Sequence, residues 1–461
     1  MVTTDRPTLV LRFADVGIAT YASLRVIGQP ERTVTWVVEE TILLAALAEL
    51  AAALPDPREA ETPVAALQRA LSHGAFSSAE AELTLAYRLG VLLISAEGWD
   101  LLQESVSDPR AVLFVTPSAR LGRVPWGQLA LPAVRPEVTA MLVARQEAIT
   151  ADGPQPAQIP WPSGEIGGLT EGFRLVELVE PLMAVPANIA HTRRRTMPRA
   201  HADPLLILDP RVPGQRADST LGSVLGRPAP DTVVARHYAD LMTRRKVRPP
   251  TETAVELFRR TDTDRQWLAG ELAAEPGRLV FVGHASSGST AEGAALHLSC
   301  RASTPGYADP VGDHRPLTAA DLMASGLRFP TRVALLACAS GGDYRFDEAT
   351  GMVAAMVLGG AELVTATLWS LPTSAGYRRF VPGEHDDPMG QVVTAIDTAH
   401  QSETDFGAAC AVNRWQRAQL RKWRAGDTAA APIYWAALVS FAVSGQAGGT
   451  ETATADSSPR R

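Results

Sequence analysis

Five short, largely apolar runs set the strongest limit on what this chain can fold into. They lie at 111–115, 205–209, 278–282, 332–337 and 362–369, with segments of helical character between them. A strand without a polar face has to be covered on both sides, as it is inside a parallel sheet flanked by helices. The pattern therefore predicts an α/β fold with a mostly parallel sheet sandwiched between helices.

The segment LTAADLMASG at 317–326 predicts one of these helices in detail. Thr318 has the character of an N-cap, and Gly326 provides a stop signal. This helix lies between the runs at 278–282 and 332–337, and a crossover helix joins parallel strands. We therefore expect these two strands to run parallel.

The rest of the chain divides by composition. Apolar and polar residues alternate over residues 8–27, which predicts two strands around a turn at Gly17. A helical region is expected from about 37 to 106. We expect an N-terminal strand pair and helical region at 1–74, a main domain at 75–445, and a disordered tail at 446–461.

Three long segments have the character of surface loops, either functional or partly disordered. They are residues 149–168, 209–231 and 300–316.

Composition limits the class of function. The chain has 461 residues, a net charge of −7 and a pI near 5.8, which give no support to nucleic-acid or anionic-membrane binding. No apolar window is long enough for a membrane span, and the first residues do not resemble a secretory signal, so we expect a cytoplasmic protein. Phosphate-binding glycine motifs and a serine-hydrolase elbow are absent from the sequence, so no cofactor is expected.

The cysteines support the same location and leave a thiol available. There are three, Cys300, Cys338 and Cys410, widely spaced and odd in number. This spacing does not fit a disulfide framework or a zinc site, and no metal is expected.

A histidine and a cysteine follow two of the apolar runs at matching positions. His284 ends RLVFVGH and Cys338 ends RVALLAC, 54 residues later. Ligands and catalytic groups of a parallel sheet gather at the carboxyl ends of its strands. A thiol with a pKa near 8.5 is mostly protonated at neutral pH, and an adjacent imidazole can accept its proton. The pair therefore predicts acyl transfer with Cys338 as nucleophile. Taken singly, either residue is more often structural.

The same segments resemble the CHAT-domain family, the bacterial caspase-like cysteine peptidases of the clan that contains caspases and separase. The resemblance rests on LVFVGHASSGS, ALHLS and PLTAADLMASGLRFPTRVALLACASGG. It extends to VLFVTPSARLGRVPWGQLAL, LGGAELVTATLWSLP and PIYWAALVSFAVSG, and so covers roughly residues 75–445.

The resemblance implies a caspase-like sheet and a Cys-His dyad of Cys338 and His284. It also implies an oxyanion site made by the backbone amides of Cys338 and Ala285. Relatives usually have glycine where this chain has Ala285, which would be strained if the position needs a positive φ. Relatives often have an acidic residue after the tryptophan strand, whereas Pro372 and Thr373 follow here.

Two residues are further candidates for the substrate cleft. Trp369 is expected to line the cleft and offer a strand edge to an extended peptide, or else to cap the core. Asp343 is expected to read a basic side chain, or else to belong, with Asp347 and Glu348, to the acidic first turn of a helix.

Two functions follow from these observations. The first is a cysteine endopeptidase that cleaves a protein partner through the dyad, as a switched effector in bacterial defence or signalling, with a separate activating or sensor protein. The second is a catalytically idle CHAT-like module that acts by binding other proteins.

Overall fold

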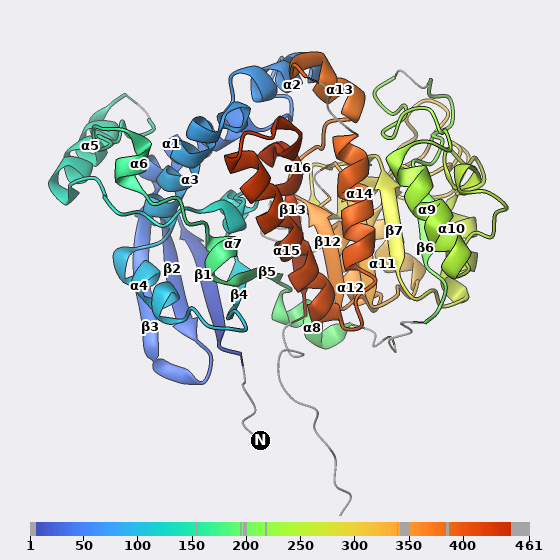
Figure 1. Cartoon of the computed structure of the whole chain (residues 1–461), viewed down its shortest axis with the longest axis horizontal. Coiled ribbons are helices and arrows are strands. Elements are labelled where there is room, and N and C mark those ends of the chain that lie inside the picture. Colours follow the sequence, from blue (N-terminus) through green and yellow to red (C-terminus); the bar gives the residue numbers. More distant parts are fainter. Residues whose placement is uncertain are drawn as a thin grey trace, which may run out of the picture.

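The computed structural model describes residues 6–152, 155–193, 196, 201–216, 219–338, 340–341, 351–383 and 387–443. In this part of the chain ten strands form one sheet in the order β3-β2-β1-β4-β5-β13-β12-β11-β7-β6, and β8, β9 and β10 form a small second sheet (Figure 1). The strands are β1 (Thr8–Val16), β2 (Ala19–Val26), β3 (Gln29–Glu39), β4 (Val112–Thr116), β5 (Glu180–Ala184), β6 (Leu205–Leu208), β7 (Leu279–Gly283), β8 (Ala285–Ser286), β9 (Ala295–Leu296), β10 (Leu317–Thr318), β11 (Arg332–Ala337), β12 (Leu363–Thr367) and β13 (Leu438–Ala442).

Helices connect most of these strands. They are α1 (Glu40–Ala53), α2 (Pro63–Ser72), α3 (Ala79–Leu93), α4 (Ala96–Glu104), α5 (Val138–Thr150), α6 (Ile166–Leu169), α7 (Leu175–Leu178), α8 (Ala187–Thr192), α9 (Val233–Arg244), α10 (Arg265–Ala273), α11 (Ala319–Ser325), α12 (Met352–Leu358), α13 (Ser374–Phe380), α14 (Pro388–Ala399), α15 (Asp405–Arg424) and α16 (Pro432–Trp435). None of the helices in the described part of the chain combines the length and apolarity needed to cross a bilayer.

Most strand pairs in the large sheet are parallel. β6, β7, β11 and β12 form one parallel set, and β1, β4 and β5 form another. β13 lies between the sets, antiparallel to β12 and parallel to β5. The N-terminal strands extend the sheet because β1 pairs with β4 on one side and with β2 on the other.

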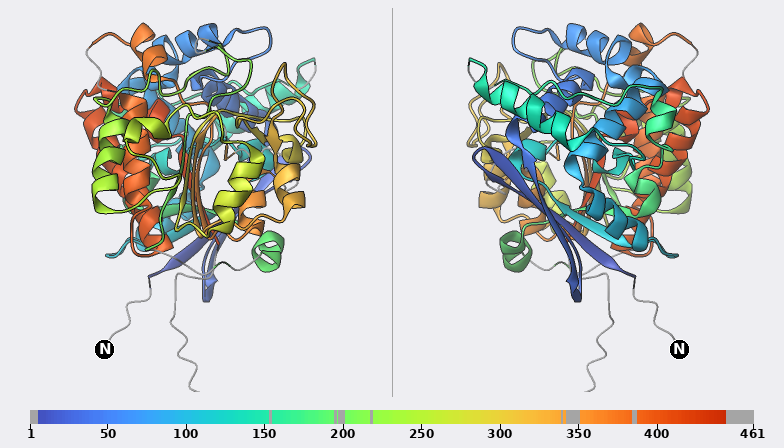
Figure 2. Two further views of the ribbon diagram at one scale, coloured as in Figure 1. Left: turned by 90° about the vertical axis from the view of Figure 1, so that its right-hand side faces the viewer. Right: turned by 90° about the vertical axis from the view of Figure 1, so that its left-hand side faces the viewer.

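Helices cover both faces of the sheet, as Figure 2 shows when the sheet is seen from its edge. α9, α14 and α15 pack together on one face, and α11 and α12 pack together on the other. The strands between them are fully buried, since all six residues of β11 and all five residues of β7 are buried. This is the arrangement that the apolar runs predict, and the mostly parallel α/β sheet is confirmed.

Local signals place α11 as expected. Thr318 Oγ1 accepts a hydrogen bond from the Asp321 amide at 3.0 Å, Asp321 reciprocates in a capping box, and Gly326 ends the helix with a φ of 65°. The strands on either side of this crossover, β7 and β11, are parallel.

The N-terminal region differs from the prediction at one element. Residues from about 37 were expected to be helical, but Gln29–Glu39 form β3, which pairs with β2, and the first helix begins at Glu40. The alternation of Val34, Trp36 and Val38 with polar or exposed neighbours is the period of a half-buried strand. The expected boundary at residues 74 and 75 stays a prediction, and the tail at 446–461 lies outside the described residues.

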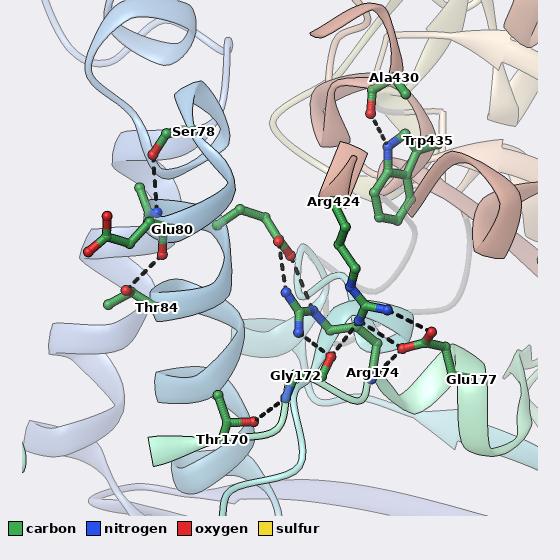
Figure 3. A network of polar contacts seen from close by, with 12 residues as sticks. Ser78, Glu80, Thr84, Thr170, Gly172, Arg174, Glu177, Arg424, Ala430 and Trp435 are labelled. Carbon is green, nitrogen blue, oxygen red and sulfur yellow. Dashed lines mark hydrogen bonds and ion pairs between the residues drawn. The ribbon is translucent and has the colours of Figure 1, made fainter. Parts of the chain in front are cut away.

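Two ion pairs, one of them buried, connect α3 to the C-terminal part of the chain (Figure 3). Arg174 donates to Glu82 of α3 at 2.7 Å and to the Gly172 carbonyl at 2.7 Å, and the side chains of Arg174 and Glu82 are only 1% and 2% exposed. Arg424, at the end of α15, pairs with Glu177 at 2.8 Å. The segment 172–177 therefore joins α3 to α15.

Candidate active site

The strand register places the two predicted catalytic residues opposite each other. Ala337 of β11 pairs with Gly283 of β7, so the next residues, Cys338 and His284, leave adjacent strand ends at the same edge of the sheet. Neighbouring strands lie about 5 Å apart. A thiol and an imidazole at these positions are within reach of each other.

A backbone carbonyl orients the imidazole. His284 Nε2 lies 3.0 Å from the Gly222 carbonyl oxygen, which can only accept, so Nε2 carries the hydrogen. Burial lowers the pKa of His284, and the Gly222 carbonyl opposes this shift only in part. The ring is therefore neutral at neutral pH, with a free lone pair on Nδ1 that can take a proton from a thiol.

A buried ion pair holds the Gly222 carbonyl in place. Arg259 Nη1 donates to this carbonyl at 3.0 Å and to Asp209 Oδ1 at 3.2 Å. Asp209 follows the end of β6 and also accepts from the Ser223 hydroxyl at 2.5 Å and the Val224 amide at 3.2 Å. Sequence reasoning missed these residues, although Asp209 follows an apolar run in the same way as His284 and Cys338.

The turn that carries Cys338 is fixed by bonds to neighbouring strands. Ser340 Oγ donates to the Leu335 carbonyl at 2.7 Å and accepts from the Thr367 amide at 3.2 Å. The Gly341 amide donates to the Thr367 carbonyl at 2.8 Å. A Cβ added at Gly341 would lie 3.3 Å from that same carbonyl oxygen, so glycine permits this close approach.

The surroundings of Cys338 favour its protonated form. Burial is the largest influence and raises the pKa of the thiol, while the Ser370 side chain and the backbone amides of Cys338 and Leu371 lower it. The negative charge of Asp56 raises it further, and the net shift is upward. At neutral pH the two shifts favour a neutral thiol and a neutral imidazole over a thiolate and an imidazolium.

The other predicted site residues lie as follows. Ala285 is in the extended strand β8 and is not among the described residues with a positive φ, so the strain expected for an alanine here does not arise. The Trp369 ring is buried, stacks on Phe76 at 5.8 Å and donates from Nε1 to the Ile433 carbonyl at 2.9 Å, as the core interpretation expects. Asp343, with Asp347 and Glu348, lies outside the described residues.

A cavity of about 360 Å³ lies between the loop that begins at Ser223 and the start of α13. One wall is the loop from Ser223 to Arg227, which directly follows Gly222, and the other is the start of α13 from Thr373. Arg227, Arg378, Asp231 and Asp387 give it a mixed charge. The cavity is therefore a polar space bordered by the loop that follows the carbonyl of Gly222.

Comparison with known proteins identifies the family. The model of the CHAT domain matches residues 84–445. The chain belongs to the CHAT domain family. This agrees with the resemblance of its histidine and cysteine segments, and the matched region contains both His284 and Cys338. No curated protein matches the CHAT chain.

Two solved structures are similar to this CHAT chain. Both are crystal structures of the Saccharomyces cerevisiae separase-securin complex, at 10% sequence identity and TM-scores of 0.43 and 0.41. In each case the match covers 95% of this chain and 30% of the other, so the chain spans less than a third of the protein that it matches.

Proposed function

We propose that this CHAT chain is a cysteine endopeptidase that cleaves a protein partner. The observation that carries the proposal is the oriented dyad: His284 and Cys338 leave paired strand ends, and Gly222 fixes the imidazole with Nδ1 free. A nucleophile, a base and a group that orients the base are the parts that covalent catalysis by a thiol needs.

The mechanism starts from the neutral pair. His284 Nδ1 takes the proton of Cys338 as the sulfur attacks the peptide carbonyl carbon, and the backbone amides of Ala285 and Cys338 stabilise the oxyanion. The C–N bond breaks, the leaving amine takes the proton from His284, and an acyl thioester remains on Cys338. Water then attacks the thioester with His284 as base, which releases the carboxylic acid and restores the thiol.

The setting of this reaction is a reducing compartment such as the cytoplasm. The three cysteines are free, and a disulfide at Cys338 would remove the nucleophile. Activation by a separate sensor protein fits the raised pKa of Cys338, because a neutral thiol needs a change of surroundings or a bound substrate to react fast.

A second candidate function, a binding module without catalysis, is favoured by the same raised pKa of Cys338. The experiment that separates the two is incubation of the chain with a peptide library from a digested proteome, followed by mass spectrometry of new N-termini. We expect cuts by the native chain that are absent with Cys338→Ala and fall about 10²–10⁴-fold with His284→Ala.

Cys410→Ala is the matched control, because this cysteine is also free but lies on α15 and does not follow β7 or β11. It should cut as the native chain does. Cuts that persist in Cys338→Ala, or no cuts by the native chain, would count against the peptidase and in favour of the binding module.

A further inference from the structure

Asp56, in the N-terminal part of the chain, contributes a negative charge that acts on Cys338. Its Oδ1 accepts from the Ser370 hydroxyl at 2.6 Å and from the Ser370 amide at 3.2 Å. Ser370 follows Trp369 beyond the end of β12, the strand next to β11, and its side chain acts on the Cys338 thiol. The loop between α1 and α2 therefore contributes a carboxylate to the dyad's edge of the sheet.

The loop that carries Asp56 is held rigidly. Arg69 of α2 donates to the carbonyls of Ala52 at 2.6 Å, Leu54 at 3.0 Å and Asp56 at 3.2 Å, and it pairs with Glu61 at 2.8 Å. α2 in turn packs beside α13, the helix that follows Ser370 in the chain (Figure 1). The position of the Asp56 carboxylate is therefore set by the fold and not by a mobile side chain on the surface.

One oxygen of this carboxylate remains available for a further interaction. Asp56 Oδ2 is buried and makes no hydrogen bond within the described residues, and it forms an ion pair with Arg123 Nη1 at 3.5 Å. That distance is longer than a charge-assisted hydrogen bond of about 2.7–2.9 Å. The negative charge of Asp56 also acts on the thiol and raises the pKa of Cys338. A buried carboxylate oxygen that is only weakly compensated favours a cationic partner.

We propose that Asp56 makes the Cys338 site selective for a positively charged group, which in a peptide substrate is the lysine or arginine side chain just before the cleaved bond. The substrate part of this inference rests on the proposed peptidase function. When Cys338 attacks a carbonyl, the side chain on the adjacent Cα lies beside Sγ, and a long basic side chain brings its charge to Asp56.

The charge can be tested without any peptidase activity. Two methanethiosulfonate reagents of similar size, one with a trimethylammonium group and one with a sulfonate, each form a mixed disulfide with a thiol and release methanesulfinate. We expect Cys338 to react at least about tenfold faster with the cation than with the anion, relative to the same ratio for a free thiol. Mass spectrometry of the Cys338 peptide separates this reaction from that of Cys300 and Cys410.

Asp56→Asn is the decisive variant. Asparagine keeps an oxygen that accepts from Ser370 but loses the charge, so the ratio should fall to that of a free thiol while the fold is kept. Arg123→Met removes the competing cation and should raise the ratio. Glu59→Gln is the matched control, because this exposed carboxylate lies in the same loop; it should leave the ratio unchanged. A ratio that is the same in Asp56→Asn as in the native chain overturns the proposal.

A pair of peptides then tests the substrate. They differ only in arginine or its neutral analogue citrulline before the cleaved bond, and kcat/KM should be at least about tenfold higher for arginine in the native chain and equal for both in Asp56→Asn. Cleavage without this preference refutes the inference and leaves the peptidase standing. An Asp56-dependent reagent ratio without any cleavage supports the cationic site and refutes the peptidase.

Discussion

Arg259 and His284 share one acceptor: Arg259 Nη1 and His284 Nε2 both donate to the Gly222 carbonyl, at 3.0 Å each. Because Arg259 is itself paired with the buried Asp209, the carbonyl that orients the imidazole is fixed by charges that do not touch the reacting atoms. Arg259 is in this sense a positioning residue.

The first prediction concerns this arginine. Arg259→Met should lower kcat about 10–100-fold with little change in KM, because a small misplacement of the imidazole costs rate and not substrate binding. Steady-state kinetics on a peptide that the native chain cleaves would measure this split.

Arg260→Met is the matched control, since Arg260 is the next residue but pairs with the exposed Asp262. It should keep the native kcat. Equal losses in both variants would mean that the segment, and not the bond to Gly222, matters.

The second prediction concerns the pH dependence of Cys338. Only the thiolate reacts with iodoacetamide, and burial raises the pKa of this thiol, so the midpoint of its alkylation should lie above the ordinary value of about 8.5. Asp56→Asn should move the midpoint to lower pH because it removes a negative charge, and Ser370→Ala should move it to higher pH because it removes a stabilising hydrogen bond. Rates of alkylation at Cys338, followed by mass spectrometry between pH 6 and 10, give the midpoints.

The opposite result is also informative. A native midpoint well below about 8.5 that rises in His284→Ala would show a thiolate-imidazolium pair at rest and would contradict a neutral thiol and imidazole. Cys410, whose thiol has its pKa raised by burial to about 11, provides a reference within the same chain.

The sequence predicts those residues of the site whose positions follow from local sequence patterns. His284 and Cys338 each lie at the end of an apolar run, and the helix between these runs has clear capping signals. A helical crossover makes the two strands parallel, so both residues lie at the same edge of the sheet. The sequence prediction of a parallel sheet was correct for the same reason.

The parts that sequence missed depend on contacts between distant segments. Gly222 contacts His284 through its backbone carbonyl, so its residue type does not reveal this contact. Asp56 binds Ser370, which lies 314 positions further along the chain. The burial of Trp369 likewise follows from the packing of Phe76, which comes from the N-terminal helical region. The strand β3 is different, because its alternation was readable in the sequence.

The third prediction concerns the buried pair Arg174 and Glu82. Glu82→Gln should lower the free energy of unfolding by about 3–5 kcal/mol, because it leaves the arginine charge buried without its carboxylate. Urea unfolding followed by circular dichroism measures the change. Glu49→Gln, which breaks a more exposed pair with Arg88, should cost less than about 1 kcal/mol, and equal costs would contradict the role of burial.

The last prediction concerns the stability of the sheet's helical cover at acid pH. Asp397 of α14 is fully buried, and burial alone would raise its pKa, but hydrogen bonds from His237 at 2.7 Å and Arg278 at 2.8 Å outweigh this and lower it. A carboxyl with a lowered pKa stabilises the folded state above its unfolded pKa of about 3.9, and this contribution is lost as the pH falls through the folded value. Asp397→Asn should therefore be less stable than the native chain at pH 7, and this difference in stability should shrink below about pH 4.

Thermal unfolding from pH 3 to 8 measures the difference in stability, with Asp240→Asn as control because Asp240 and its partner Arg244 are exposed. A difference that stays constant with pH would show that Asp397 contributes through packing and not through its charge.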